Sequence, residues 1–428
     1  MKVCVIGLGK IGLPTAVQYA SKGATVIGVD KNKKIVDLAN KGISYIKEEP
    51  FLQKKLKAAW KKGKFKATVN LAKAVSESDF ISVAVPLIVD KNKKADYSII
   101  EGVSKKIGKN LAKDSTVIFE TTMPVGDTRK KLAPLLEKSS KLIAGKDFFV
   151  VYSPERVNNG DVFLDLKRYP KIVSGINEKA AKKGVQFYKK VLDARVLNVG
   201  LLETAEMIKL CGMTYRDTNI ALANEYARIC SEKGLDVTKI IEGANTIPHT
   251  HILSPGIGVG GHCAPVYPHF LIQKAKEQGL DLELLKAARK VNDSNPAYYL
   301  KKLKKELNGL KGKNILLLGL SYRQNVKQTS FAPSLEIIRL LKKEKARVFA
   351  CDPLFEKKEI KALGAQAVEL NNWPTVNAVI LMSFHRQFKK LDLKKLKARG
   401  ARIFLDGRNA VDGKKIERLK MKYIGIGR

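Results

Sequence analysis

The segment from Pro255 to Pro268 places one cysteine, Cys263, behind four closely spaced glycines. Glycine allows positive φ and lets the backbone approach a ligand, but it weakens ordinary helices and strands. Pro265 follows, at a position that a first helical turn tolerates. A thiol near a helix N-terminus has a stabilised thiolate, which is the nucleophilic form of cysteine. The loop therefore indicates a nucleophile site, and the alternative is a buried cysteine beside a glycine turn.

A second constellation lies at the N-terminus, where an apolar run of strand type leads into GLGKIG at 7–12. A helical pattern follows, and a second strand ends at Asp30. Strand, glycine turn, helix, strand and terminal acid form the dinucleotide-binding fingerprint. We expect Gly7 to make the tight turn, Gly9 to admit a pyrophosphate to the helix N-terminus, and Gly12 to let helix and strand pack closely. The alternative is a glycine-rich turn in another kind of α/β domain.

The acid at the end of that second strand bears on the cofactor. Asp30 lies 18 residues beyond Gly12 and can accept hydrogen bonds from a ribose diol, which favours NAD over NADP. Three lysines close by, Lys31, Lys33 and Lys34, leave this preference open.

The composition is strongly basic, with 80 Lys+Arg against 41 Asp+Glu and a net charge of +39. Such a field attracts anions, including nucleic acid. The basic residues are spread along the chain, without the interleaved aromatic residues that are typical of RNA-binding surfaces. We therefore expect a solvated basic surface and no specific nucleic-acid partner. A nucleic-acid-binding function would depend on charge alone.

Other features bound the compartment. No apolar run reaches the ~20 residues of a membrane helix, and the N-terminus enters a glycine turn where a signal peptide would continue. The five cysteines are scattered and form no C-x-x-C pair, as in a reducing cytoplasm. The histidines show no metal-ligand spacing, and we interpret His249 and His251 as polar loop residues. The prediction is a cytoplasmic protein with no membrane segment and no metal site.

The 428 residues predict two or three domains. Residues 1–200 alternate strand and helix, which is typical of a parallel, doubly wound sheet. Ligands of such sheets bind beyond the carboxyl ends of the strands, and Pro86, Thr122 and Glu155 lie there. The strand candidates are 3–6, 25–29, 80–85, 116–119, 148–152 and 172–174.

The rest of the chain reads as a helical middle followed by a second α/β unit. Residues 201 to about 245 predict one long helix, broken near Gly234, and a further helical stretch covers about 270–292. A new strand at 314–318 opens the second unit. The predicted fold class is α/β, with an N-terminal Rossmann sheet, a central helical dimerisation segment and a C-terminal Rossmann-like domain. Further strands are predicted at 348–351, 378–382 and 402–405.

Two more motifs are YSPERV at 152–157 and AEMIKL at 205–210. With the dinucleotide fold, the GVGGHC loop at 258–263 and the second α/β unit, they make the chain resemble the UDP-glucose/GDP-mannose dehydrogenase family over essentially its whole length. The GVGGHC loop and YRDTNIALANE at 215–225 most resemble the branch that acts on UDP-2-acetamido sugars such as UDP-N-acetylmannosamine.

The resemblance implies a four-electron oxidation of the sugar C6 alcohol to a carboxylate, with two NAD consumed. Cys263 would add to the intermediate aldehyde, giving a thiohemiacetal and then a thioester that water hydrolyses. Lys209 would stabilise oxyanions and lower the thiol pKa, Glu155 would position or activate water, and Thr122 would lie near the nicotinamide. The alternative for Lys209 is a surface lysine without a catalytic role, and the alternative for Glu155 is a glutamate that caps a helix or forms an ion pair.

The resemblance also implies the binding residues. The cofactor would contact the three glycines of the turn and four further residues: Ile11, Asp30, Pro86 and Thr122. The sugar nucleotide would contact six residues: Glu155, Arg156, Lys209, Gly260, Arg323 and Arg408. His262 is interpreted as structural.

Three domains follow from the resemblance. Residues 1–200 would bind NAD, residues 201–300 would carry the Cys263 loop and form a homodimer, and residues 311–428 would bind the UDP-sugar.

Four departures from the family pattern fall on functional positions. Tyr267 stands where the family normally has Asp, Met213 where it has Asn, and His249 where it has a loop arginine. The C-terminal motif at 322–331 has lost its acids and its arginine. A tyrosine is a poor base at neutral pH. The alternative function is therefore a diverged nucleotide-sugar-binding or regulatory homologue with weakened or lost oxidation.

Overall fold

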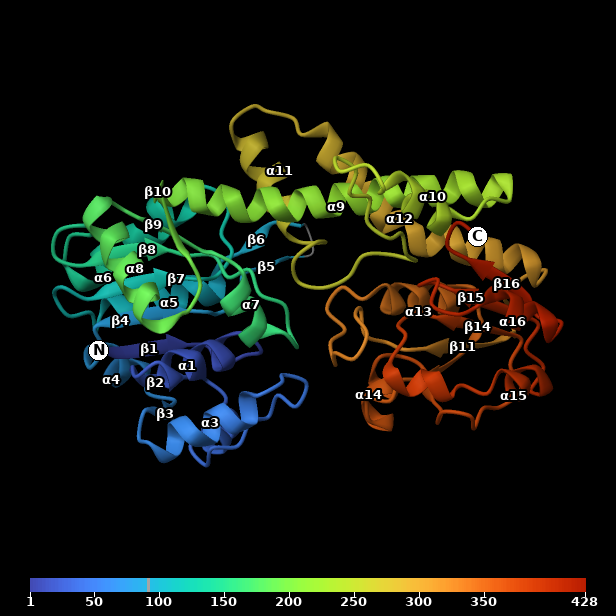
Figure 1. The fold of residues 1–428 in the computed structure, drawn as a ribbon, viewed down its shortest axis with the longest axis horizontal. Coiled ribbons are helices and arrows are strands. Elements are labelled where there is room, and N and C mark those ends of the chain that lie inside the picture. The colour runs from blue at the N-terminus through green and yellow to red at the C-terminus, as the bar shows by residue number, and fades with distance from the viewer. Residues whose placement is uncertain (91–92) are drawn as a thin grey trace. The chain divides into compact units, whose positions relative to one another are not determined.

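The computed structural model describes residues 1–90 and 93–428 and contains two compact units (Figure 1). Unit 1 comprises residues 1–212 and 269–278, and unit 2 comprises residues 213–268 and 279–428. Each unit is built on a large sheet of its own.

The sheet of unit 1 has eight strands in the order β10-β9-β8-β7-β4-β1-β2-β3. The six strands from β8 to β3 run parallel, as predicted. The edge pair reverses direction, because β9 is antiparallel to β8 and parallel to β10. The strands are β1 (Lys2–Ile6), β2 (Thr25–Val29), β3 (Phe65–Thr68), β4 (Phe80–Val83), β7 (Thr116–Phe119), β8 (Phe149–Tyr152), β9 (Lys171–Gly175) and β10 (Val196–Leu201).

The apolar pattern predicts neither β3 nor β10. In β3 the exposed Lys66 separates the buried Phe65 and Ala67, and β10 is largely exposed, so neither shows the continuous apolar run of a strand that is buried on both faces. A short antiparallel hairpin, β5 (Ile88–Val89) and β6 (Ala95–Asp96), follows β4. The helical segments are α1 (Gly12–Ser21), α2 (Lys33–Ala39), α3 (Leu52–Lys61), α4 (Leu71–Ser76), α5 (Ser98–Gly108), η1 (Thr128–Leu132), α6 (Ala133–Ser140), α7 (Val162–Arg168) and α8 (Glu178–Val191).

The sheet of unit 2 has six parallel strands in the order β13-β12-β11-β14-β15-β16. Alternate residues of β11 enter two different cores: Ile315 and Leu317 lie in one, and Leu316 and Leu318 lie in the other. Both faces are therefore covered, as in a doubly wound sheet. The strands are β11 (Asn314–Leu318), β12 (Arg347–Cys351), β13 (Gln366–Ala367), β14 (Ala378–Leu381), β15 (Ile403–Asp406) and β16 (Lys422–Gly425).

A similar glycine turn follows the first strand of each sheet, at Gly7 after β1 and at Gly319 after β11. Gly319 after β11 has a φ of +83° and donates its N–H to the Cys351 carbonyl at 2.9 Å. The next amide, of Leu320, donates to Asp352 Oδ2 at 2.6 Å. The helices around this sheet are α13 (Pro333–Lys343), α14 (Lys357–Ala362), η2 (Arg386–Lys390), α15 (Leu393–Ala398) and α16 (Gly413–Arg418).

The predicted long helix consists of α9 (Leu202–Lys233) and α10 (Val237–Ala244). The expected break is present at Gly234, whose φ is +65°. The helix predicted over 270–292 is instead two helices, α11 (Tyr267–Glu277) and α12 (Glu283–Glu306). They are separated at Gly279, which has a φ of +76° that an α-helix cannot continue through.

Candidate active site

The glycine turn after β1 fits the predicted cofactor. Gly7 has a φ of +94°, and its N–H donates to the Val29 carbonyl at 2.8 Å. A Cβ at Gly12 would lie 1.8 Å from the Gly7 carbonyl oxygen, so a side chain does not fit where α1 begins. A Cβ at Gly9, in contrast, would meet no heavy atom within 4 Å. Open space beside the amides of a helix N-terminus suits a pyrophosphate, and these residues therefore fit NAD.

The carboxylate of Asp30 is held by backbone amides. Its Oδ2 accepts from the Leu8 N–H at 2.9 Å, and its Oδ1 accepts from the Asn32 N–H at 2.8 Å. Each carboxylate oxygen has two lone pairs. Asp30 therefore retains acceptor capacity for a ribose diol while it fixes the glycine turn.

Of the three other predicted cofactor residues, one lies in this turn and two follow strands of the same sheet. Ile11 is half-buried at the start of α1, Pro86 is exposed beyond β4, and Thr122 is buried beyond β7. The Thr121 hydroxyl donates to the Val85 carbonyl at 2.6 Å, which joins the segments after β4 and β7.

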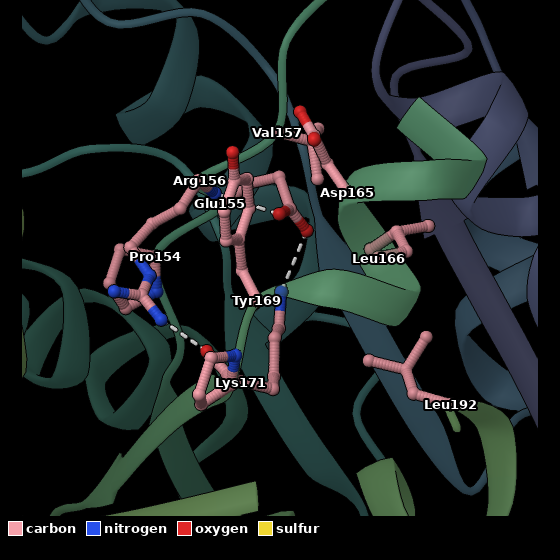
Figure 2. A pocket seen from close by; sticks show the side chains of 10 residues that line it. Pro154, Glu155, Arg156, Val157, Asp165, Leu166, Tyr169, Lys171 and Leu192 are labelled. Carbon is pink, nitrogen blue, oxygen red and sulfur yellow. Dashed lines mark hydrogen bonds and ion pairs between the residues drawn. The ribbon is translucent and has the colours of Figure 1, made fainter. Parts of the chain in front are cut away.

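Glu155 and Lys209 are in direct contact. Lys209 Nζ, from α9, donates to the backbone carbonyl of Glu155 at 2.6 Å. The Glu155 carboxylate has other partners: Oε2 accepts from Lys171 Nζ at 2.7 Å, and Oε1 accepts from the Arg156 N–H at 2.7 Å (Figure 2). The two predicted catalytic residues thus meet through the main chain of Glu155, and its charged group is directed at Lys171.

Arg156 directs its guanidinium at the Pro170 carbonyl, to which it donates a hydrogen bond (Figure 2). With Glu155, Asp165 and Lys171 it lines a cavity of about 10 Å³. That volume holds about one water molecule. The cavity is therefore a candidate water site beside the Glu155 carboxylate, and it is too small for a sugar.

Sequence reasoning missed Glu206, although it lies in the AEMIKL motif three residues before Lys209. Its buried carboxylate accepts from the N–H groups of Gly126 and Thr128, at 2.5 and 3.0 Å. Burial raises the pKa of Glu206 to about 7, because the loss of solvent outweighs these hydrogen bonds. Glu206 thus fixes the loop that follows Thr122 against the helix that carries Lys209.

The raised pKa of Glu206 predicts a pH-dependent stability. The folded protein holds this proton up to about pH 7, whereas the unfolded chain releases it near pH 4.5. The free energy of unfolding should therefore fall as the pH rises from about 4.5 to about 7, by about 3 kcal/mol from this residue. Glu206→Gln should remove that slope in denaturant titrations at a series of pH values. Glu225→Gln, at an exposed position on the same helix, is the control. Equal slopes in wild type and Glu206→Gln would contradict the assignment.

In unit 2 the glycine–cysteine loop packs against the segment that follows β11. The Gly261 N–H donates to the Ser330 carbonyl at 2.8 Å, and Gly261 has a φ of +101°. A Cβ at Gly260 would lie 2.6 Å from the Cβ of Tyr322. Both glycines are therefore required by this packing, and they deliver a half-buried Cys263.

Cys263 precedes α11 by four residues, so it lies further from the helix than its spacing from Pro265 predicts. Its carbonyl accepts from the N–H groups of Val266 and Tyr267, at 3.0 and 2.9 Å, in the turn that leads into α11. The neighbouring His262 shares a 2.8 Å hydrogen bond between its Nε2 and the Ser330 hydroxyl.

Two of the arginines that are predicted to contact the sugar nucleotide, Arg408 and Arg323, are also in unit 2. The Arg408 guanidinium donates to the carbonyls of Met382 and Tyr322, at 2.9 and 3.2 Å, and a Cβ at Gly256 would lie 3.1 Å from its Nη1. Arg408 thus lies beside the start of the glycine–cysteine loop. Arg323 is half-buried in the segment after β11.

The predicted catalytic residues divide between the units. Thr122, Glu155 and Lys209 belong to unit 1, and Cys263 belongs to unit 2. Their convergence on one substrate stays a prediction. Of the departing positions, His249 is exposed, and Met213 and Tyr267 are half-buried.

Asp352, at the end of β12, is the counterpart of Asp30 in the second sheet. It is buried, and its Oδ2 accepts from the Leu320 N–H and lies 3.1 Å from His385 Nε2. His385 Nδ1 accepts from the Asn325 N–H at 2.8 Å, so the ring proton is on Nε2 and is donated to Asp352.

Within the described residues, no helix is both long and apolar enough to cross a bilayer.

Family models match three consecutive parts of the chain. They describe the NAD binding domain (residues 1–192), the central domain (203–294) and the UDP binding domain (316–413) of the UDP-glucose/GDP-mannose dehydrogenase family. The UDP-N-acetyl-D-mannosamine dehydrogenase of Pyrococcus horikoshii is 34% identical, with 100% of this chain and 99% of that protein covered. The NDP-N-acetyl-D-galactosaminuronic acid dehydrogenase of Ralstonia nicotianae is 35% identical, with 97% of each covered.

The fold agrees with these matches. The solved structure of the UDP-D-ManNAc dehydrogenase of Pyrococcus horikoshii has a TM-score of 0.89 and 32% identity, over 100% of this chain and 99% of that one. The likeness covers the whole chain, including both sheets and the glycine turn that fits NAD. The chain therefore belongs to the UDP-glucose/GDP-mannose dehydrogenase family and is an NAD-dependent nucleotide-sugar dehydrogenase.

Proposed function

We propose that this dehydrogenase oxidises the C6 alcohol of a UDP-2-acetamido sugar, of the UDP-N-acetylmannosamine type, to the uronic acid. Full-length relatives that are named for 2-acetamido sugars support this substrate class. The observation that carries the proposal is the loop at Cys263, where Gly260 and Gly261 leave no room for a side chain against Tyr322. This packing fixes the backbone of the loop and so holds the half-buried thiol of Cys263 in one position, as a covalent nucleophile requires.

Cys263 links the two halves of the four-electron oxidation. NAD, when bound, accepts a hydride in each half. The Cys263 thiolate adds to the C6 aldehyde carbon, and the resulting oxyanion takes a proton to give a thiohemiacetal. After the second oxidation C6 is a thioester, and water breaks the C–S bond, which releases the carboxylate and returns the thiolate. The covalent bond keeps the aldehyde from escaping.

The other residues stabilise charge and hold the substrate. The Lys209 ammonium stabilises the oxyanion at C6, Glu155 positions the water, and Thr122 lies at the nicotinamide. Arg408 pairs with the diphosphate, for which a guanidinium is well shaped, and Arg323 contacts the sugar nucleotide. Arg156 and Gly260 complete the sugar site.

We assign the NAD site to residues 1–200, the central segment to 201–300 and the UDP-sugar site to 311–428. The central helix is also the dimer contact. Tyr215, Leu222 and Ile229 on α9 are 60%, 41% and 59% exposed, and they recur every seven residues on one face. An exposed apolar stripe of this kind suits a second copy of the chain. We place the homodimer in the cytoplasm.

The function is tested by NADH production from UDP-N-acetylmannosamine, UDP-N-acetylglucosamine, UDP-glucose and GDP-mannose. We expect two NADH and one uronate per UDP-2-acetamido sugar, and slower turnover of the other two nucleotide sugars. NAD binding without turnover of any nucleotide sugar would instead favour a diverged binding or regulatory homologue, in which Met213 and Tyr267 have cost the chemistry.

A further inference from the structure

Two lysines are buried in the described part of the chain, Lys171 and Lys209, and both bind Glu155. Lys171 bonds the Glu155 carboxylate and Lys209 bonds its carbonyl. We propose that Lys171 is a positioning residue for the oxidation, which holds the Glu155 carboxylate so that Lys209 meets the carbonyl of Glu155 and not its carboxylate. The proposal rests on the proposed role of Lys209.

The reversed direction of β9 places Lys171 at the site. β8 and β9 pair antiparallel, with Val151 opposite Gly175 and Tyr152 opposite Ser174. Continuing this register by three residues brings Glu155, just beyond β8, opposite Lys171, the first residue of β9. If β9 ran parallel to β8, its first residue would lie at the opposite end of the strands, beside the start of β8. Because β9 is antiparallel, it brings a cation to the carboxyl ends of the parallel strands, where ligands of such sheets bind.

Two carboxylates keep the buried ammonium charged. Lys171 Nζ lies 2.7 Å from Glu155 Oε2 and 3.6 Å from Glu120 Oε1. Burial opposes the charge, but Glu155 and Glu120 together outweigh it and raise the pKa of Lys171. Glu120 Oε1 is itself fixed by the hydroxyls of Tyr19 and Tyr188, at 2.7 and 2.6 Å. Lys171 is thus a permanent cation in a rigid frame.

This frame immobilises Glu155 at three points. Its Oε2 bonds Lys171, its Oε1 bonds the Arg156 N–H, and its own N–H donates to the Glu120 carbonyl at 3.2 Å. Without the Lys171 ammonium, the carboxylate would lose its counter-ion beside a second ammonium, that of Lys209. A buried carboxylate that loses its counter-ion is strongly destabilised, and the Lys209 ammonium lies 2.6 Å from the carbonyl oxygen of the same residue. The Glu155 carboxylate would then compete with the substrate oxyanion for Lys209.

The first test compares single variants by kcat, by KM for the sugar nucleotide and by Kd for NAD. Lys171→Met should lower kcat about 10- to 100-fold and leave KM and Kd within about twofold. Lys171→Arg keeps the charge and should stay within about fivefold of wild type. Lys167→Met, at an exposed position on α7, is the matched control and should be unchanged. Wild-type kcat in Lys171→Met would overturn the proposal.

The second test asks whether Lys171 acts through Glu155. The kcat of the double variant Lys171→Met/Glu155→Gln should be less than about twofold lower than that of Glu155→Gln alone. If the two residues acted independently, the kcat losses of the single variants would multiply in the double variant, and that result would overturn the proposal. If Lys171→Met does not fold, Lys171→Met/Glu120→Gln, which also removes a buried negative charge, replaces it with the same expectations.

A readout without turnover separates this proposal from the proposed function. Reductive methylation of Lys209, followed by mass spectrometry of its peptide, should slow at least about threefold in Lys171→Met, because an ion pair with Glu155 favours the unreactive ammonium. An unchanged rate would overturn the role of Lys171. A wild-type protein that oxidises no nucleotide sugar would overturn the proposed function instead.

Discussion

Replacement of Cys263 by serine should lower the rate of uronate formation by at least about 10³-fold and leave NAD affinity unchanged. A serine hydroxyl is not ionised at neutral pH, so no covalent bond to the C6 aldehyde forms and the second oxidation has no thiohemiacetal to act on. The measurement is the number of NADH and uronate molecules formed per sugar nucleotide. Wild type should give two NADH, and Cys263→Ser should give at most one and almost no uronate.

The control for this variant is another thiol of the chain. Cys211 is exposed on α9, whereas burial raises the pKa of the Cys4 and Cys351 thiols to about 12. Cys211→Ser should therefore keep wild-type turnover, and Cys211 is the thiol to remove before Cys263 is alkylated. Full uronate formation by Cys263→Ser, or by protein alkylated at Cys263, would refute the covalent mechanism.

A second large effect is expected at the glycine turn, where two alanine substitutions should differ in kind. Gly9→Ala places a methyl group in open space, so the fold should persist while NAD binds about 100-fold more weakly, because the methyl occupies the path of the pyrophosphate. Gly12→Ala places its Cβ 1.8 Å from the Gly7 carbonyl oxygen. It should destabilise the protein by about 3 kcal/mol or more and abolish NAD binding.

Thermal unfolding and calorimetric titration with NAD separate the two outcomes. Gly102→Ala is the control: it lies within α5, where its Cβ would also meet nothing within 4 Å. It should raise stability slightly, as alanine does in a helix, with NAD affinity unchanged. Equal NAD affinity of Gly9→Ala and wild type would place the cofactor elsewhere.

The parts of the fold that the sequence predicts well are those with a strong local pattern. The continuous apolar runs of β2 and β7 have the predicted bounds, and Gly234 ends α9 because a helix cannot pass a residue with positive φ. The reversed direction of β9 has no such signal. An apolar run reads the same in either direction, and the pairing partner is set by the path of the chain between the strands.

The same limit applies to the site. Motif spacing predicts that Glu155 and Lys209 matter, but it does not predict that they meet through a carbonyl. Lys171 carries no signal in a chain with 80 Lys+Arg, because most of these residues are solvated and only burial distinguishes it. Glu206 lies inside a recognised motif, and its significance comes from the two distant amides that it binds.

The turn shared by the two sheets has a consequence for how many coenzymes one chain can hold. In the first sheet α1 starts at Gly12, directly after the turn, and Asp30 keeps lone pairs for a ligand. In the second, α13 starts only at Pro333 and Asp352 is enclosed by amides and His385. The second turn thus lacks both the helix terminus for a pyrophosphate and the open acid for a ribose. We therefore expect each chain to hold one dinucleotide, at the turn of the first sheet.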